Sequence, residues 1–215
     1  MPCPSVPEAP EHNQPHRSPA SWAEIVDSLD APTIFVVIGS WLGAEARAAI
    51  SVEDVWQDAL WMAWRDRNQH DWQGLARYRA WLLGIARNRV HDAMRALSRK
   101  KRGGGRTARF SDLGGHDTVG GMLPPRSTTP SRMASHMERA RVLESALATL
   151  EQPLQDVVRL RIFEEQPMEL AAQQLGIPLS TAKHRLVRGM QAYRNELQQR
   201  LGDSTGSTGS SEGEA

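Results

Sequence analysis

Apolar residues recur with the period of an α-helix along two segments of the chain, and no segment shows sustained alternation of apolar and polar positions. After Val52, apolar side chains occur at positions 55, 56, 59, 60 and 63, which form one stripe of a helix. The second segment predicts three helices: Leu154–Phe163, Pro167–Leu175 and a third that starts at Ser180 and ends near Leu197. Helix starts are also expected at three capping residues that precede a carboxylate by three positions: Ser21, Ser51 and Ser135. Together these patterns predict an all-α protein.

Proline and glycine divide the chain into two compact segments. Residues 1–20 hold six of the thirteen prolines, and residues 103–135 hold seven of the seventeen glycines. We therefore expect a disordered Pro-rich tail at 1–20, a flexible linker at 103–135 and a second disordered tail at 202–215. The segments between them, 21–102 and 136–201, are expected to fold as two small helical domains.

The net charge of +1 hides a strong separation of charge along the chain. Residues 84–110 carry nine Lys and Arg against Asp92 alone, whereas residues 21–83 carry five Arg and nine acids. The same contrast recurs near the C-terminus, where residues 179–201 are basic and residues 138–169 are acidic. Acidic and basic blocks on one molecule favour one surface for a protein partner and another for phosphates.

Cysteine usage and hydropathy exclude several classes of protein. Cys3 is the only cysteine, so an internal disulfide, a Cys-based zinc site and an iron–sulfur cluster are all excluded. The longest apolar run, at 34–44, is interrupted and too short to cross a bilayer, and the N-terminus lacks the pattern of a signal peptide. We expect a cytoplasmic protein with no cofactor and no insertion into a membrane.

A polar stripe lies opposite the apolar stripe of the helix that follows Ser51. Its members recur at i, i+3, i+4 and i+7, and we call them the docking face: Asp54, Gln57, Asp58 and Trp61. Two carboxylates, an amide and an exposed ring on one face are suited to binding another protein. The alternative is an ordinary solvated helix face.

A basic helix follows an aromatic-rich stretch. We call its polar residues the basic face: Arg87, Asn88, His91, Arg95, Arg99 and Lys100. Positions 88, 91, 95 and 99 share one side of a helix, so Asn88 and His91 could meet a base while the arginines follow the phosphates. The rings of Trp72 and Tyr78 either assist in contacting unstacked bases or belong to the core. The alternative for the whole stretch is a solvated helix end.

The last three predicted helices have the spacing of a helix-turn-helix. Ala172 allows close approach of the helices, Gly176 permits a tight turn, and Ile177 with Ala182 packs the third helix across the second. The third helix carries polar residues that we call the recognition face: Thr181, Lys183, His184, Arg185 and Arg188. Its basic character favours DNA as the partner, and the alternative is a three-helix module that binds protein.

Three stretches of the chain resemble one protein family. They are Asp-Val-Trp-Gln-Asp-Ala-Leu at 54–60, Tyr-Arg-Ala-Trp-Leu at 78–82 with Ile-Ala-Arg-Asn at 85–88, and Leu-Gly-Ile-Pro-Leu-Ser-Thr-Ala-Lys-His-Arg-Leu at 175–186. In order, they resemble the core-binding helix, the −10-reading helices and the region 4 helix-turn-helix of bacterial sigma factors. Two such segments with a linker and no extra domain are typical of the extracytoplasmic-function (ECF) group.

This resemblance implies a sigma factor, which is not an enzyme, that directs core RNA polymerase to a subset of promoters. The docking face would bind the clamp helices of the largest polymerase subunit, the basic face would hold the −10 element, and residues 180–188 would read the −35 element. An anti-sigma factor is a further candidate partner. The Pro-rich N-terminal extension is not part of the family pattern.

Two other functions are compatible with parts of the sequence. A metal-dependent hydrolase would need three His-Asp pairs to converge, and they lie in a predicted turn, on the basic helix and in the linker: His70-Asp71, His91-Asp92 and His116-Asp117. A stand-alone helix-turn-helix transcriptional regulator is the stronger alternative. A regulator would bind its operator alone, whereas a sigma factor would bind duplex DNA poorly without the polymerase.

Overall fold

The computed structural model describes residues 14–101 and 129–206, and within these ranges the chain forms helices and turns with no β-strand. The predicted all-α fold is therefore confirmed. The segments 1–13, 102–128 and 207–215 lie outside the described residues, and they include most of the expected linker and tails.

The chain divides into two compact units. The first comprises Met1–Asp30 with Trp41–Thr129, and the second comprises Ala31–Ser40 with Pro130–Ala215. The proline and glycine pattern predicts that residues 31–40 belong to the first domain, so this boundary differs from the expectation. The physical reason lies in the apolar run Ile34–Ile38, in which every side chain is buried. Such a run has no polar face to indicate which neighbours it packs against.

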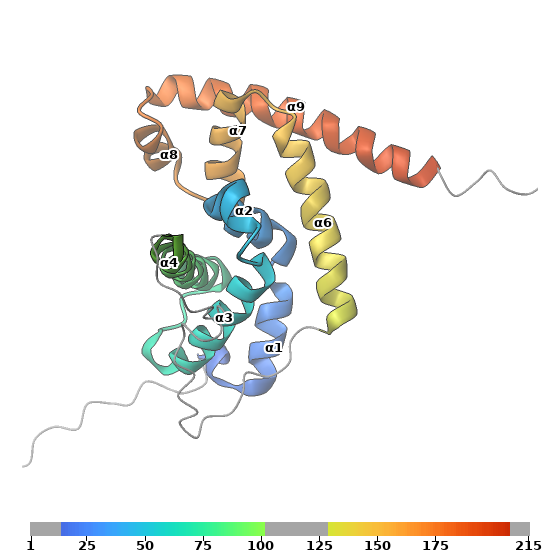
Figure 1. Cartoon of the computed structure of the whole chain (residues 1–215). Coiled ribbons are helices and arrows are strands. Elements are labelled where there is room, and N and C mark those ends of the chain that lie inside the picture. Colours follow the sequence, from blue (N-terminus) through green and yellow to red (C-terminus); the bar gives the residue numbers. More distant parts are fainter. Residues whose placement is uncertain (1–13, 102–128, 207–215) are drawn as a thin grey trace, which may run out of the picture. The chain divides into compact units, whose positions relative to one another are not determined.

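The first unit is built around two helices that pack along each other. Its elements are η2 (Pro15–Arg17), α1 (Pro19–Ser28), the end of α2 (Ala31–Arg47), α3 (Val52–Arg65), η3 (Arg67–Gln69) and α4 (Leu75–Lys101) (Figure 1). Helix α3 packs against α4, and each buries an apolar stripe: Val55, Trp56, Ala59 and Ala63 on α3, and Tyr78, Leu82, Ala86 and Val90 on α4. The stripe predicted after Val52 is therefore the core of this unit.

Helix starts in the first unit follow the predicted caps only in part. The Ser51 hydroxyl accepts hydrogen bonds from the backbone N–H groups of Glu53 and Asp54, so the predicted cap of α3 is confirmed. Helix α1 begins at Pro19 rather than near Ser21, because proline at the first position of a helix is favoured by its fixed φ angle.

The N-terminal extension is folded from residue 14 onward, which corrects the expectation of a disordered tail over 1–20. The His16 side chain is fully buried, and its Nε2–H donates to the carbonyl oxygens of Arg67 and His70, both at 2.9 Å. The side-chain oxygen of Gln14 accepts a hydrogen bond from the Trp72 backbone N–H at 2.7 Å. We call residues 14–17 the N-terminal clasp, because they bind the segment between α3 and α4 through these contacts.

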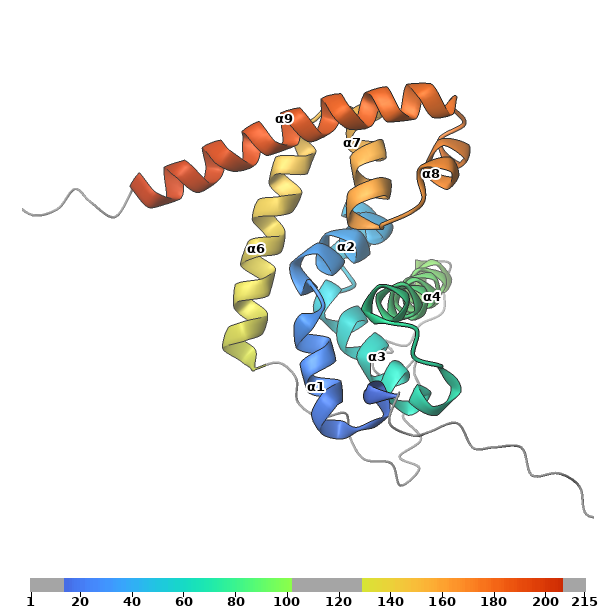
Figure 2. The same ribbon diagram turned by 180° about the vertical axis from the view of Figure 1, so that it is seen from behind.

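The second unit contains α6 (Pro130–Ala148), α7 (Gln152–Val158), the π-helical turn η4 (Arg159–Phe163), α8 (Met168–Gln174) and α9 (Leu179–Gly206). Figures 1 and 2 show α9 lying across the ends of α6 and α7, with α8 beside its first turns. Helix α6 begins before the predicted cap at Ser135, and α9 continues beyond the predicted end near Leu197. Residues 130–135 and 202–206, which were expected in the linker and in the C-terminal tail, are therefore helical.

One predicted helix of the second unit is interrupted by a change of helical type. The apolar spacing predicts a single helix over Leu154–Phe163, whereas α7 ends at Val158 and one π-helical turn follows. An ion pair between Arg159 and Glu164 spans this turn. The extra residue of a π turn redirects the chain toward α8, and hydrophobic spacing alone carries no signal for it.

Within the described ranges, no single helix is long and apolar enough to cross a membrane, and only the bent pair α1 and α2 meets that test jointly.

Candidate nucleic-acid interface

The turn between α8 and α9 is closed by two backbone hydrogen bonds. The Gly176 N–H donates to the Gln173 oxygen and the Ile177 N–H donates to the Ala172 oxygen, each at 3.1 Å. This pair of bonds is the Schellman motif, which requires a left-handed residue directly after the helix. Gly176 has φ of 65° and supplies that conformation without steric cost. The predicted tight turn at this glycine is confirmed.

Small residues let α9 lie close to its neighbours. Ala172 and Ala182 are buried, as the helix-turn-helix spacing predicted. Further along α9, a Cβ atom added at Gly189 would lie 2.7 Å from Val158 Cγ2 and 3.3 Å from the Leu154 backbone oxygen. The close approach of α9 to α7 at this glycine was not predicted.

The recognition face lies on the outward side of α9. Lys183, His184 and Arg188 are exposed, and Thr181 and Arg185 are half-buried. Among the described residues, none of the five takes part in a salt bridge, so their donors remain available to a ligand. Val187, which is not among the predicted site residues, is 70% exposed on the same side. Its position could have been predicted, because Val187 follows Lys183 by four residues and therefore lies on the same side of the helix.

The docking face on α3 is divided between solvent and α4. Asp54 and Gln57 are exposed. Trp61 is half-buried, and the guanidinium carbon of Arg65 lies 5.3 Å from its ring centroid. Asp58 differs from the others, because its Oδ2 accepts a hydrogen bond from Arg89 Nη2 of α4 at 2.9 Å.

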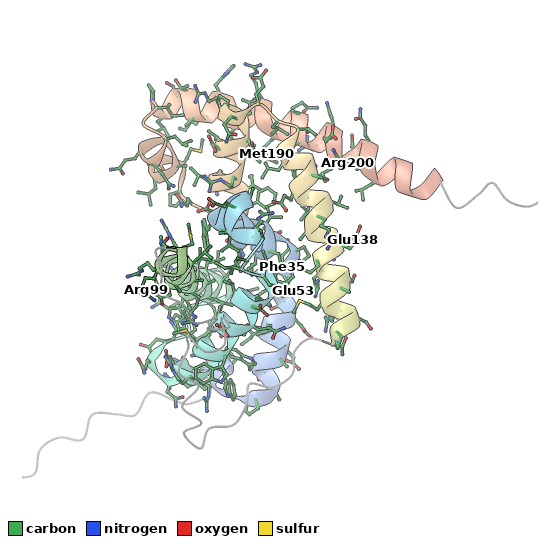
Figure 3. All side chains as sticks on the ribbon, in the orientation of Figure 1. Phe35, Glu53, Arg99, Glu138, Met190 and Arg200 are labelled. Atoms are coloured by element: carbon green, nitrogen blue, oxygen red, sulfur yellow. The ribbon has the colours of Figure 1, made fainter. Side chains whose placement is uncertain are left out.

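The basic face follows the exposed side of α4. Arg87, Asn88, His91, Arg95 and Arg99 are all exposed, and Figure 3 shows Arg99 on this helix. The side chain of Lys100 lies outside the described part of the chain. Arg95 Nη2 lies 3.4 Å from Asp92 Oδ1, an exposed contact one turn apart that water screens strongly. Cationic side chains along one exposed side are able to follow a phosphate backbone.

Of the two rings proposed as base contacts, Tyr78 belongs to the interior of the first unit, and Trp72 is half-buried beside it. Tyr78 is fully buried, and burial raises the pKa of its hydroxyl far above the usual value. Trp72 stacks on His16 with ring centroids 5.8 Å apart, and His70 stacks on Trp81 at 4.4 Å. These rings therefore form one cluster with the N-terminal clasp. No local pattern predicts this cluster, because the clasp and the residues that it contacts are more than fifty residues apart in the chain.

The described part of the chain contains no metal site of the kind that a metal-dependent hydrolase would need. No group of three or more His, Cys, Asp or Glu in residues 14–101 and 129–206 is arranged to hold a metal ion. Of the three His-Asp pairs, His116-Asp117 lies outside these ranges. His70 is half-buried in the aromatic cluster, and His91 is exposed on α4.

Comparison with known families identifies one part of the chain. Residues 140–192 match the family model described as Sigma-70, region 4. The match runs from α6 to the middle of α9, so it contains the whole helix-turn-helix and the recognition face. This segment is thus similar to region 4 of sigma-70-type factors, which is a DNA-binding region. The comparison with curated proteins gave no match.

Proposed function

We propose that the protein is a sigma factor of the ECF type, which binds core RNA polymerase and directs it to a subset of promoters. The observation that carries the proposal is the recognition face, which is basic, has three exposed and two half-buried residues, and lies within the segment that matches sigma-70 region 4. Region 4 implies RNA polymerase and promoter DNA as partners in general terms. The ECF assignment rests on the two-unit organisation and on the sequence resemblance of α3 and α4.

Each face has a distinct role in this proposal. The recognition face of α9 reads the −35 element in the major groove, where Arg185 and Arg188 are long enough to reach a guanine edge or a phosphate. Val187 adds an apolar surface suited to a thymine methyl group. The basic face of α4 holds the −10 element, and Asp54, Gln57 and Trp61 of α3 dock on the clamp helices of the polymerase.

The proposed activity needs binding energy but no covalent chemistry. Flipping bases out of a duplex costs a few kcal/mol, which hydrogen bonds and stacking in a protein site can offset. Two DNA-contacting units on one chain also raise each other's effective concentration, so each can bind weakly alone. An anti-sigma factor and a cytoplasmic location are further parts of the same proposal.

The decisive experiment is transcription in vitro with purified core polymerase and genome-wide mapping of start sites. We expect the full chain to co-purify with the core enzyme, to shift duplex DNA poorly alone and to produce discrete start sites with the core. A stand-alone regulator would instead shift its operator without the polymerase and yield no new start sites. That result would overturn the proposal.

A second experiment separates strand opening from duplex binding. We expect Asn88→Ala to impair open-complex formation on duplex promoters and to be partly rescued by a template with a mismatched −10 region, because the mismatch removes the cost of unpairing. Arg95→Ala with Arg99→Ala is the matched control, and its rescue should be smaller because phosphates need neutralisation on either template. Equal defects of Asn88→Ala on both templates, in single-round transcription, would exclude a special role in opening.

A further inference from the structure

A chain of alternating charges leads from α3 to the basic face of α4. Asp58 Oδ2 lies 2.9 Å from Arg89 Nη2, Arg89 Nη1 lies 4.0 Å from Asp92 Oδ2, and Asp92 Oδ1 lies 3.4 Å from Arg95 Nη2. Its two ends are therefore the docking face and the basic face. Arg89 belongs to neither set of predicted functional residues.

The members of this chain differ in their contact with water. The side chains of Asp58 and Arg89 are 19% and 12% exposed, whereas those of Asp92 and Arg95 are 55% and 71% exposed. Exposed ion pairs contribute little, because water and salt screen them. A charge-assisted hydrogen bond that is mostly shielded from water is stronger and more sensitive to the loss of one partner. The pair that links α3 to α4, Asp58 with Arg89, is thus the one shielded from water, and we call it the inner pair.

The position of Arg89 on α4 allows its pairing with Asp58 to limit the rotation of α4 about its own axis. On the same helix, Tyr78, Ala86 and Val90 face the core, whereas Asn88 and His91 face solvent. Arg89 lies at the border between these two sides and reaches α3, thirty-one residues earlier in the chain. Apolar packing alone permits some rotation of α4 about its axis, and a directional hydrogen bond at the border opposes that rotation.

We infer that Asp58 and Arg89 form an interhelical lock that positions the basic face of α4 relative to the docking helix. Because the inference deepens the proposed function, its role in promoter opening rests on that proposal. Arg89 is a positioning residue, since it orients Asn88 and His91 without a part in DNA contact itself. Asp58 acts mainly toward α4, and Asp54 with Gln57 provides the polar contacts to the polymerase.

The lock is tested first without the polymerase, by a double-mutant cycle read out as thermal unfolding of the full chain. Asp58→Asn and Arg89→Gln keep the shape of each side chain and remove its charge. We expect each to lower the unfolding temperature of the first unit by about 4–8 °C. The double variant should lose no more than the larger single loss, because both changes break one interaction. Additive losses would overturn the inference.

Asp54→Asn is the matched control, because it removes a carboxylate from an exposed position one turn earlier on α3. It should weaken core binding and lower the unfolding temperature less than either lock variant, because an exposed carboxylate in the first turn of α3 stabilises the helix only slightly. Arg89→Gln should show the reverse pattern, with core affinity within about twofold of wild type and open-complex formation reduced about tenfold, the equivalent of one charge-assisted hydrogen bond. The pair of variants therefore separates docking from positioning.

The charge exchange Asp58→Arg with Arg89→Asp provides a rescue experiment. We expect it to recover more than half of the opening defect caused by Arg89→Asp alone, because the attraction is restored with its sign reversed. If Arg89→Gln weakens core binding as strongly as Asp54→Asn while its unfolding temperature stays unchanged, Arg89 belongs to the docking surface and the lock is wrong. If the wild-type chain binds no core polymerase, the proposed function fails, whereas the unfolding cycle still decides whether the pair holds α3 to α4.

Discussion

The two units present their proposed functional side chains in different ways. On α9 of the second unit, the recognition face points outward, and in the described chain its five residues form no internal salt bridge. On α3 and α4 of the first unit, Asp58 forms an ion pair with Arg89 of the other helix, and Arg95 forms one with Asp92 one turn away on its own helix. The second unit therefore offers a preformed surface, whereas the first unit uses some of its charges to orient others.

This difference shows how far helical periodicity can be used to assign function. Periodicity separates the inner side of a helix from the outer side, and it did so correctly for α9, where a single basic side faces solvent. At the border between the two sides, the neighbouring helix determines whether a side chain meets solvent or another residue. Asp58 and Arg89 both lie at such a border.

The largest effect is expected at the docking face of the first unit. Asp54→Arg should reduce affinity for core polymerase by about 2–5 kcal/mol, because it reverses a charge in a complementary interface. The fold should persist, since Asp54 is exposed. A pull-down titration measures the affinity, and circular dichroism serves as the control for folding. If this variant binds core polymerase with wild-type affinity, the docking face is not the surface that binds the polymerase.

The recognition face of the second unit should respond differently at its two arginines. If Arg185 or Arg188 reads a base, its replacement by Ala should cost about 1–3 kcal/mol and relax specificity at one −35 position. If the arginine binds a phosphate, all promoters should weaken alike and the salt dependence should become less steep. Footprinting of the polymerase complex at several salt concentrations distinguishes these results. Unchanged footprints at the −35 element in both variants would contradict the assignment.

The packing of the second unit can be tested independently of function. Gly189→Ala should destabilise this unit by about 1–3 kcal/mol, because the new Cβ would lie 2.7 Å from Val158 Cγ2 and close to the Leu154 backbone. Gly84→Ala on α4 of the first unit is the matched control. A Cβ there meets nothing within 4 Å, so alanine should stabilise its helix by about 0.5–1 kcal/mol. Thermal unfolding measures both, and equal shifts would contradict the close approach of α9 to α7.

The smallest effect concerns the pH dependence of the N-terminal clasp. Burial lowers the pKa of His16, with a further contribution from Arg17, although the Arg67 and His70 carbonyls and Asp71 oppose the change. Burial and His16 likewise lower the pKa of His70. The neutral forms are therefore favoured in the folded state. Their contribution to stability should be complete above about pH 6.5 and should be lost as the pH falls through the lower folded-state values.

Unfolding temperatures measured between neutral and mildly acidic pH check this expectation. The first unit should unfold at a lower temperature as the pH falls, and His16→Gln should make the dependence shallower. Gln is a suitable replacement because its side-chain amide can donate to the Arg67 and His70 carbonyls that His16 now contacts, both at 2.9 Å. A dependence as steep as that of the wild type would contradict the role of His16.

Much of the local structure was predictable from the sequence. The helical period after Val52 predicted the buried side of α3, Ser51 predicted its cap, and Gly176 predicted the turn before α9. The recognition face and the exposed part of the basic face also lie where their spacing placed them. These features depend on residues within one or two helical turns of each other, so a short stretch of sequence contains the whole interaction.

Other features were decided only by the tertiary structure. The pairing of Asp58 with Arg89 spans thirty-one residues, and the hydrogen bonds of His16 span more than fifty. The grouping of residues 31–40 with the second unit also depends on distant helices, because their apolar run has no side that differs from the others. The periodicity of apolar residues indicates which side chains become buried, but the partners of these side chains depend on how separate helices pack. That packing results from the summed contacts of the whole unit, which no local pattern contains.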